Sequence, residues 1–440
     1  MTGLWVLGIV CPVGQSGCWY SFVSGRIMKR TLLSQPNICV KLFGEGFELL
    51  PSATELFELE MAYLEHKAID EQGLIQRSAY FKTVNGKPTR HFLMCSRLAE
   101  VNSQGRSARA KTYFKEGQFS TGYATHGLFP YRGKFHPQVI RGILNVIGVK
   151  EGETILDPMC GSGTANIEAA LMGIHSIAVD VSPFCRLMTK AKYDALITNG
   201  TTFLNIQGKA DKLFDFFMQG DVSRRIRKLA NDEKIMAYEI SLLAFLDAMG
   251  YARRVSTRTH KELFGSVLNR YLSTIEGFQL NPFFDKKNLG LLRVLPNSDA
   301  THLEIKDCTI DAVITSPPYS FAIDYAENDA PQLAYLGYNI EELRAKMIGL
   351  KGRRKNEKLT TYFADMGRVC LEISRVLKKG KYFVLIIGSN TNQTGGIRLE
   401  DKMIHSCEET GLKLVGSILK PIKGMRNTMK DEYILFFRKE

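Results

Sequence analysis

The residues best suited to chemistry begin in a strand, turn and helix near the middle of the chain. The β-branched and aliphatic run 154–156 predicts a strand that ends at an acid, Asp157. Gly161 and Gly163 predict a sharp turn, because glycine lets the backbone approach a ligand with no side chain between them. Apolar residues at helical spacing follow from Ala165. A strand, a glycine-rich turn and a helix form the nucleotide-binding corner of a doubly wound sheet.

A second polar tip lies far downstream. The apolar run 312–314 predicts another buried strand, which ends in the rigid sequence Ser316-Pro317-Pro318-Tyr319. Proline has a fixed backbone and no N–H, so the pair holds the Pro317 carbonyl rigidly. The Ser316 hydroxyl accepts hydrogen bonds, and the Tyr319 ring offers a stacking face.

Together the two motifs resemble those of S-adenosylmethionine-dependent amino-methyltransferases of nucleic acids. The family signatures are Asp-Pro-Phe-x-Gly-Ser-Gly-Thr and Ser/Asp-Pro-Pro-Tyr, and here Met159 stands where phenylalanine is usual. The Ser-Pro-Pro-Tyr form is similar to the cytosine N(4)-specific branch. The resemblance implies S-adenosylmethionine as cofactor, held by Asp157, Pro158, Cys160, Gly161, Gly163 and Thr164, and a catalytic tip of Ser316, Pro317, Pro318 and Tyr319.

Three further cofactor positions follow. The strand 176–179 ends at Asp180, where the ribose hydroxyls of a cofactor need acceptors. Asp299 resembles the adenine-contacting position of the family. The stretch 125–138, which mixes aromatic and basic residues, is similar to a family motif beside the methionine end of the cofactor, and it makes Phe129 a candidate contact.

The chemistry that this resemblance implies is methylation of an exocyclic amine. The cytosine amine is a poor nucleophile because its lone pair is delocalised into the ring. Ser316 and the Pro317 carbonyl would accept its hydrogen bonds and align the lone pair with the methyl sulfonium. Positioning, more than acid–base catalysis, would then supply the rate. In duplex DNA the base would first have to leave the stack.

Other chemistries fit the sequence badly. Methylation of a pyrimidine carbon would need a cysteine, commonly after proline, and no Pro-Cys pair occurs. His302-Leu303-Glu304 matches the deaminase His-x-Glu pattern, but Pro-Cys-x-x-Cys is absent. No Gly-Lys-Ser/Thr loop suggests an NTPase. The nine cysteines are scattered singly, which indicates reduced thiols in a cytoplasmic protein and no metal site.

The composition is that of a globular protein, with 45% hydrophobic and 23% charged residues among 440. A net charge of +13 favours a polyanionic partner. Basic residues gather in two places, a helical insertion and a loop at 344–358, although a solvated surface would look the same. The candidate nucleic-acid contacts are Arg224, Arg225, Arg253 and Arg254 in the insertion, and Lys351, Arg353, Arg354 and Lys355 in the loop.

The order of the motifs divides the chain. We expect an α/β fold with a doubly wound, Rossmann-like sheet, and the resemblance to the methyltransferase family implies that this sheet has seven strands, one of them reversed near its edge. The apolar run 4–13 is too short to span a bilayer. Two short strands are predicted at 78–82 and 90–94. The expected parts are a non-structural extension 1–27, an N-terminal flank or small appended domain 28–120, a cofactor half 121–200, a helical insertion and candidate target-recognition region 201–290, and a catalytic half 291–440.

Three functions stay open at this point. The first is a cytosine N(4) DNA methyltransferase, for which a restriction endonuclease is a candidate partner. The second is an RNA methyltransferase acting on an exocyclic amine, such as guanine N(2) in transfer RNA, with the flank as RNA-binding module. The third is a non-catalytic nucleic-acid binder with a degenerate site.

Overall fold

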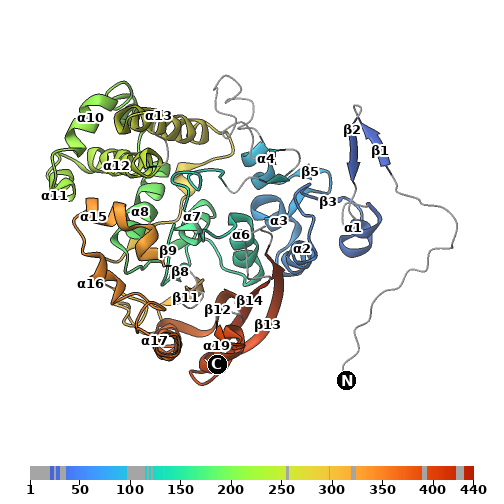
Figure 1. Cartoon of the computed structure of the whole chain (residues 1–440). Coiled ribbons are helices and arrows are strands. Elements are labelled where there is room, and N and C mark those ends of the chain that lie inside the picture. Colours follow the sequence, from blue (N-terminus) through green and yellow to red (C-terminus); the bar gives the residue numbers. More distant parts are fainter. Residues whose placement is uncertain are drawn as a thin grey trace.

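The fold is taken from a computed structural model of the whole chain (Figure 1). The structure describes residues 20–23, 26–29, 36–96, 114–115, 118–119, 122–131, 133–253, 257–296, 298–318, 324–388, 394–422 and 431–440.

A seven-stranded sheet forms the centre of the molecule, in the order β10-β9-β8-β11-β12-β14-β13. All neighbouring pairs are parallel except those of β14, which runs antiparallel to both β12 and β13. The predicted α/β sheet with one reversed strand near its edge is therefore confirmed. The strands are β8 Thr154–Asp157, β9 His175–Ala178, β10 Leu292–Val294, β11 Ile310–Thr315, β12 Leu377–Gly388, β13 Leu412–Pro421 and β14 Asp431–Lys439.

Helices cover both faces of this sheet, which explains why β11 is buried along its whole length. Ala312 and Ile314 point to the face covered by α6 and α7, while Val313 points to the face covered by α17 and α19. Because successive side chains of a strand point to opposite faces, β11 contributes side chains to two separate hydrophobic cores. The covering helices are α6 Pro137–Val146 and α7 Thr164–Leu171 on one face, and α17 Lys355–Val376 and α19 Leu399–Glu408 on the other.

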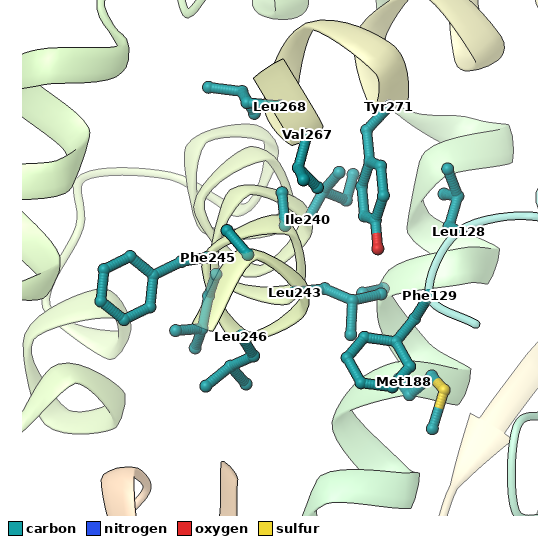
Figure 2. Close-up of a cluster of buried hydrophobic side chains, with 14 of the residues drawn as sticks. Leu128, Phe129, Met188, Ile240, Leu243, Phe245, Leu246, Val267, Leu268 and Tyr271 are labelled. Atoms are coloured by element: carbon teal, nitrogen blue, oxygen red, sulfur yellow. The ribbon is translucent and has the colours of Figure 1, made fainter. Parts of the chain in front are cut away.

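The predicted helical insertion is helical in the structure (Figure 1). The helix α12 is apolar and long enough to cross a membrane by length and composition, but much of it is buried against α8 and α13. The buried side chains of these three helices form a hydrophobic cluster, and Figure 2 shows Leu243, Phe245 and Leu246 of α12 within it. The elements are α8 Pro183–Ile197, α9 Gly200–Leu204, α10 Ala210–Phe217, α11 Val222–Arg227, α12 Asp232–Ala252 and α13 His260–Gln279.

The N-terminal flank carries a small antiparallel sheet, β3-β4-β5, and packs on the main core through α2. The strand predicted at 78–82 overlaps β4, but the one predicted at 90–94 is wrong. Residues there form α4, whose first turn is closed by Thr89, which accepts from the backbone N–H of Phe92. The elements are α1 Pro36–Phe43, β3 Phe47–Leu49, α2 Leu56–Ala68, α3 Glu71–Arg77, β4 Phe81–Val84, β5 Lys87–Pro88 and α4 Arg90–Ser96.

Two two-stranded hairpins complete the N-terminal region: β1 Tyr20–Val23 pairs with β2 Arg26–Lys29, and β6 Phe114–Lys115 pairs with β7 Gln118–Phe119. The first hairpin includes residues of the predicted non-structural extension. Residues 1–19 of that extension lie outside the described residues.

The segment after β11 forms three short helices, α14 Tyr325–Asn328, α15 Ala330–Tyr335 and α16 Ile340–Arg344. The loop predicted at 344–358 ends earlier than expected, because α17 begins at Lys355. Glu357 accepts from the backbone N–H groups of Arg353 and Arg354, at 2.9 and 3.2 Å. This contact closes the first turn of the helix and so shortens the loop.

Candidate active site at the strand tips

The two motifs of the sequence meet at one edge of the sheet. The carboxyl ends of the neighbouring parallel strands β8, β9 and β11, with the segment after β10, line a cavity of about 1020 Å³ counting its open mouth. This is the place where open α/β sheets bind ligands. The predicted residues that line the cavity are Pro158, Cys160, Gly161, Thr164, Asp180, Asp299, Ser316 and Pro318.

The two glycines of the turn have different tasks. Both have positive φ, +49° at Gly161 and +75° at Gly163. A Cβ on Gly163 would lie 2.7 Å from the Thr189 side chain, so this glycine lets α8 approach the turn. Among the described residues, a Cβ on Gly161 would meet only Tyr131, at 3.6 Å, and would otherwise enter the cavity. Gly161 therefore keeps ligand space open, whereas Gly163 serves packing.

Asp157 is buried behind the turn. Its Oδ1 accepts from the Thr315 hydroxyl at 2.8 Å and from the backbone N–H of Met159 at 3.2 Å. Within the described part of the chain its Oδ2 is buried and has no hydrogen-bond partner. Burial raises the pKa of this carboxyl to about 7. The Thr315 contact joins the cofactor turn to the residue before Ser316, and sequence reasoning missed it.

Asp180 lies where a ribose would need acceptors. One carboxylate oxygen accepts from the backbone N–H of Gly161 at 2.9 Å, and the other from that of Ser182 at 2.8 Å. Burial raises the pKa of Asp180, and these two hydrogen bonds oppose the shift. Each oxygen retains a second lone pair for a ligand hydroxyl. The fixed carboxylate and the open space above Gly161 fit the nucleoside part of S-adenosylmethionine.

Asp299 is held by its own turn. Its Oδ1 accepts from the backbone N–H of Thr301 at 2.7 Å and from the Thr301 hydroxyl. Ala300 and Thr301 also line the cavity. The turn thus forms the wall on the β10 side, where the adenine position was expected.

The Ser-Pro-Pro tip after β11 reaches the same cavity. Ser316 and Pro318 are half-buried and line it, whereas Pro317 is buried and does not. Tyr319 lies outside the described residues. The structure therefore brings the predicted serine together with the cofactor turn.

Phe129 does not line this cavity. It has φ +67° and packs on Phe184, with ring centroids 5.0 Å apart. Figure 2 shows it directed toward Met188 and Leu243 in the hydrophobic cluster. Tyr131, two residues later, lines the cavity instead. We therefore move the proposed cofactor contact from Phe129 to Tyr131, whose signal was present in the same aromatic-rich stretch.

The basic loop forms part of the cavity wall through residues that sequence reasoning did not single out: Lys346, Met347, Ile348 and Leu350. Lys351, predicted to bind nucleic acid, instead pairs with the buried carboxylate of Asp365 at 2.8 Å. Arg353, Arg354 and Lys355 are exposed and follow Leu350, which lines the cavity, by three to five residues.

The basic residues of the insertion are differently placed. Arg224 is 67% exposed, but the guanidinium of Arg225 lies over the Phe216 ring at 3.8 Å. Arg253 lines a second cavity next to the first. Arg254 lies outside the described residues. Among the residues that the structure describes, no group of His, Cys, Asp or Glu is arranged to hold a metal ion.

Comparisons with known proteins found methyltransferases among the similar sequences and structures. A family model described as the RMKL-like methyltransferase domain of UPF0020 matches residues 128–227. The Type II methyltransferase M.BsoBI of Geobacillus stearothermophilus is 24% identical over 313 residues, 57% of this chain and 61% of that protein. The tRNA (guanine(10)-N2)-dimethyltransferase of Methanothermobacter thermautotrophicus is 45% identical over 53 residues, 12% of this chain and 16% of that protein.

Among solved structures, a SAM-dependent methyltransferase of Methanosarcina mazei aligns with 66% of this chain and 94% of its own, at 11% identity and a TM-score of 0.30. The chain spans about three fifths of the length of M.BsoBI. The family model and the match to M.BsoBI confirm the resemblance that the two motifs indicated: the chain is similar to S-adenosylmethionine-dependent nucleic-acid methyltransferases, and its strand-tip cavity is suited to hold that cofactor.

Proposed function

We propose that the protein transfers a methyl group from S-adenosylmethionine to an exocyclic amine of a base in DNA, with cytosine N(4) as the acceptor. One observation carries the proposal: Ser316 and Pro318 line the same cavity as Gly161 and Asp180. A group held by the glycine turn and a group held by the Ser-Pro-Pro tip would therefore meet.

The cofactor side of the reaction is binding and orientation. Asp180 would accept from the ribose hydroxyls, and the turn at Gly161 would allow the backbone to contact the ligand. Asp299 and its turn would border the adenine. When bound, S-adenosylmethionine supplies an electrophilic methyl group on its sulfonium.

The acceptor side is alignment of a weak nucleophile. The Ser316 hydroxyl would accept a hydrogen bond from the amine, which directs the lone pair out of the base plane toward the methyl group. Stacking by Tyr319 remains a prediction of the sequence. Arg353, Arg354 and Lys355 would contact phosphates beside the cavity, which would fix the register of the strand without reading its sequence.

DNA is favoured over RNA by the longer of the two alignments, that to the Type II methyltransferase M.BsoBI. Serine at position 316 is the residue of the cytosine branch. The alternative, an RNA amino-methyltransferase acting on guanine N(2), is favoured by the local match to a tRNA guanine dimethyltransferase. A cytoplasmic location belongs to both proposals, whereas a cognate restriction endonuclease belongs to the DNA proposal only.

The product decides between these functions. The purified protein is incubated with S-adenosylmethionine and either unmodified plasmid DNA or bulk transfer RNA, and each nucleic acid is digested to nucleosides for mass analysis. N(4)-methyldeoxycytidine is the expected product. N(2)-methylguanosine in the RNA would replace the proposal by its alternative, and methylation of neither would overturn both.

A further inference from the structure

The carboxyl of Asp329 lies where the cofactor cavity meets a second cavity. The second cavity lies between α12, the aromatic stretch before α6, and the helices α14 and α15. Three residues line both cavities: Tyr131, Tyr325 and Asp329. Arg253, a predicted nucleic-acid contact, lines the second cavity with Tyr251.

Asp329 is 8% exposed, so its side chain is buried at this junction. Within the described part of the chain, its carboxylate has no hydrogen-bond or ion-pair partner. Buried carboxyls without a partner cost stability and are rare, so each needs an explanation.

Helix capping does not explain it. Asp329 precedes α15, but its side chain makes no capping bond, and its backbone N–H and carbonyl already bond Tyr325 and Leu333. Asp324 differs from Asp329 in this respect. Its carboxylate caps α14 by accepting from the backbone N–H of Glu327, and it pairs with Arg344 at 2.7 Å. The carboxylate of Asp324 thus stabilises the fold, whereas the carboxyl of Asp329 borders the two cavities and has no such role.

The surroundings suit a planar, hydrogen-bonding ligand. The rings of Tyr131 and Tyr325 are nearly parallel, with an interplanar angle of 18° and centroids 6.4 Å apart. Aromatic faces of this kind bind unstacked bases in proteins that hold single strands. Arg253 at the mouth adds a positive charge for the attached phosphates.

We propose that Asp329 determines specificity by hydrogen-bonding the ring-nitrogen edge of the extruded target cytosine, beside the faces of Tyr131 and Tyr325. The inference rests on the proposed function, because it places the base between the Ser-Pro-Pro tip and this junction. It adds a residue that neither motif contains.

The hydrogen-bond pattern selects the base. A neutral carboxyl donates its O–H to cytosine N3 and accepts from the N(4) amine, while the other N(4) hydrogen remains for Ser316. Guanine presents two donors, N1–H and the N(2) amine, which pair with an ionised carboxylate. A neutral Asp329 therefore matches cytosine and mismatches guanine.

The protonation state agrees with this choice. Burial raises the pKa of Asp329 to about 7, and Asp180 adds to the shift. The thiol of Cys185 and the hydroxyls of Tyr131 and Tyr325 also face it, and all three have raised pKa values, so none adds a charge at neutral pH. Across the cavities lie Lys346, Arg253 and Asp247, the last paired with Arg270 at 2.6 Å.

The test compares Asp329→Asn and Asp329→Ala, with Glu327→Gln as control. Asparagine copies a neutral carboxyl, since it donates one hydrogen bond and accepts another, whereas alanine does neither. Glu327 is 73% exposed on the neighbouring helix α14. The rate of N(4)-methyldeoxycytidine formation is measured against plasmid DNA concentration from pH 6 to 9, with S-adenosylmethionine affinity measured by calorimetry.

The wild type and the control should lose kcat/KM as pH rises above about 7, because the neutral form disappears. The kcat/KM of Asp329→Asn should stay within about threefold of the wild-type value at pH 6.5. It should not decrease as the pH rises above about 7. Asp329→Ala should lower kcat/KM about 10- to 100-fold with cofactor affinity unchanged.

Equal rates and pH profiles in all four proteins, or an Asp329→Asn as slow as Asp329→Ala, would overturn the inference and leave the proposed function standing. If the wild type forms no N(4)-methyldeoxycytidine, the proposed function fails and the inference fails with it.

Discussion

At the residue scale, the site depends on contacts between single residues, and only some of these contacts can be predicted from the sequence. Glycine at a strand tip and an acid at the end of the next strand are recognisable because few residues can fill those positions. The contact between Thr315 and Asp157 was not predictable, because it joins residues 158 apart in sequence through one hydroxyl. The shift from Phe129 to Tyr131 has a similar cause, since two aromatic residues in one stretch look alike until the backbone direction is known.

The two glycines provide the first prediction. Gly161→Ala should weaken S-adenosylmethionine binding at least tenfold with only about 1–2 kcal/mol lost from the free energy of unfolding, the cost of a positive φ. Gly163→Ala should lose more unfolding free energy, because its Cβ would meet Thr189 at 2.7 Å. Calorimetry and urea unfolding of both variants check this. Normal cofactor affinity in Gly161→Ala would contradict the assignment.

Thr315 provides the second prediction. The folded chain keeps Asp157 protonated up to about pH 7, whereas the unfolded chain ionises it above about pH 4. The unfolded chain therefore binds fewer protons in this range, and the unfolding free energy from this group falls as pH rises from about 4 to about 7.

Thr315→Val removes a hydrogen bond that lowers the Asp157 pKa, so the pKa should be higher in the variant. The decrease of the unfolding free energy with pH should therefore continue above pH 7. The variant should also lose about 1–3 kcal/mol of unfolding free energy. Thr315→Ser, which keeps the hydroxyl, is the control. Urea unfolding between pH 4 and 9 measures both effects, and identical profiles for valine and serine would refute this account.

At the element scale, prediction succeeded for strands with a clear apolar run and failed where helix capping determined the structure. The strands predicted at 154–156, 176–179 and 312–314 agree with β8, β9 and β11 within a few residues. The segment 90–94 was read as a strand from its apolar residues, yet Thr89 closes a helical turn there. The basic loop likewise ends at Lys355 through one acidic side chain, Glu357.

The basic loop gives the third prediction. Replacing Arg353, Arg354 and Lys355 together by alanine should weaken DNA binding and reduce its salt dependence, by about 0.9 in the log–log slope per lost phosphate contact. A charge-matched control replaces Lys306, Lys379 and Lys413, which are exposed near the amino-terminal ends of β11, β12 and β13. Fluorescence titrations at several salt concentrations compare the two. Equal slopes would show that the loop is only a solvated surface.

At the scale of the whole molecule, the two motifs and the order of strands and helices indicated the architecture, because members of one protein family share the same topology. The attachment of the N-terminal flank could not be predicted, since it depends on buried polar contacts between distant segments. Glu65 of α2 is fully buried and accepts from Ala79 N–H, Ser78 Oγ and the side-chain amide of Asn145 in α6.

This network gives the fourth prediction. Because the flank and the sheet share one hydrophobic cluster, they should unfold together in a single calorimetric transition. Glu65→Ala should lower the temperature of that whole transition, because it leaves three buried donors without an acceptor. Glu60→Ala, an exposed position on the same helix, should leave it nearly unchanged. Two transitions, of which only one shifts, would show that the flank is an independent domain.

The central claim is that the Ser-Pro-Pro tip and the glycine turn act on one reaction in one cavity. Single-turnover methylation of unmodified DNA with tritiated S-adenosylmethionine, comparing the wild type with Ser316→Ala, tests it most directly. The variant should bind the cofactor normally yet form N(4)-methyldeoxycytidine roughly 10- to 1000-fold more slowly, the scale of about 1.4–4 kcal/mol of lost alignment. An undiminished rate in Ser316→Ala, or 5-methyldeoxycytidine as the product, would contradict the account.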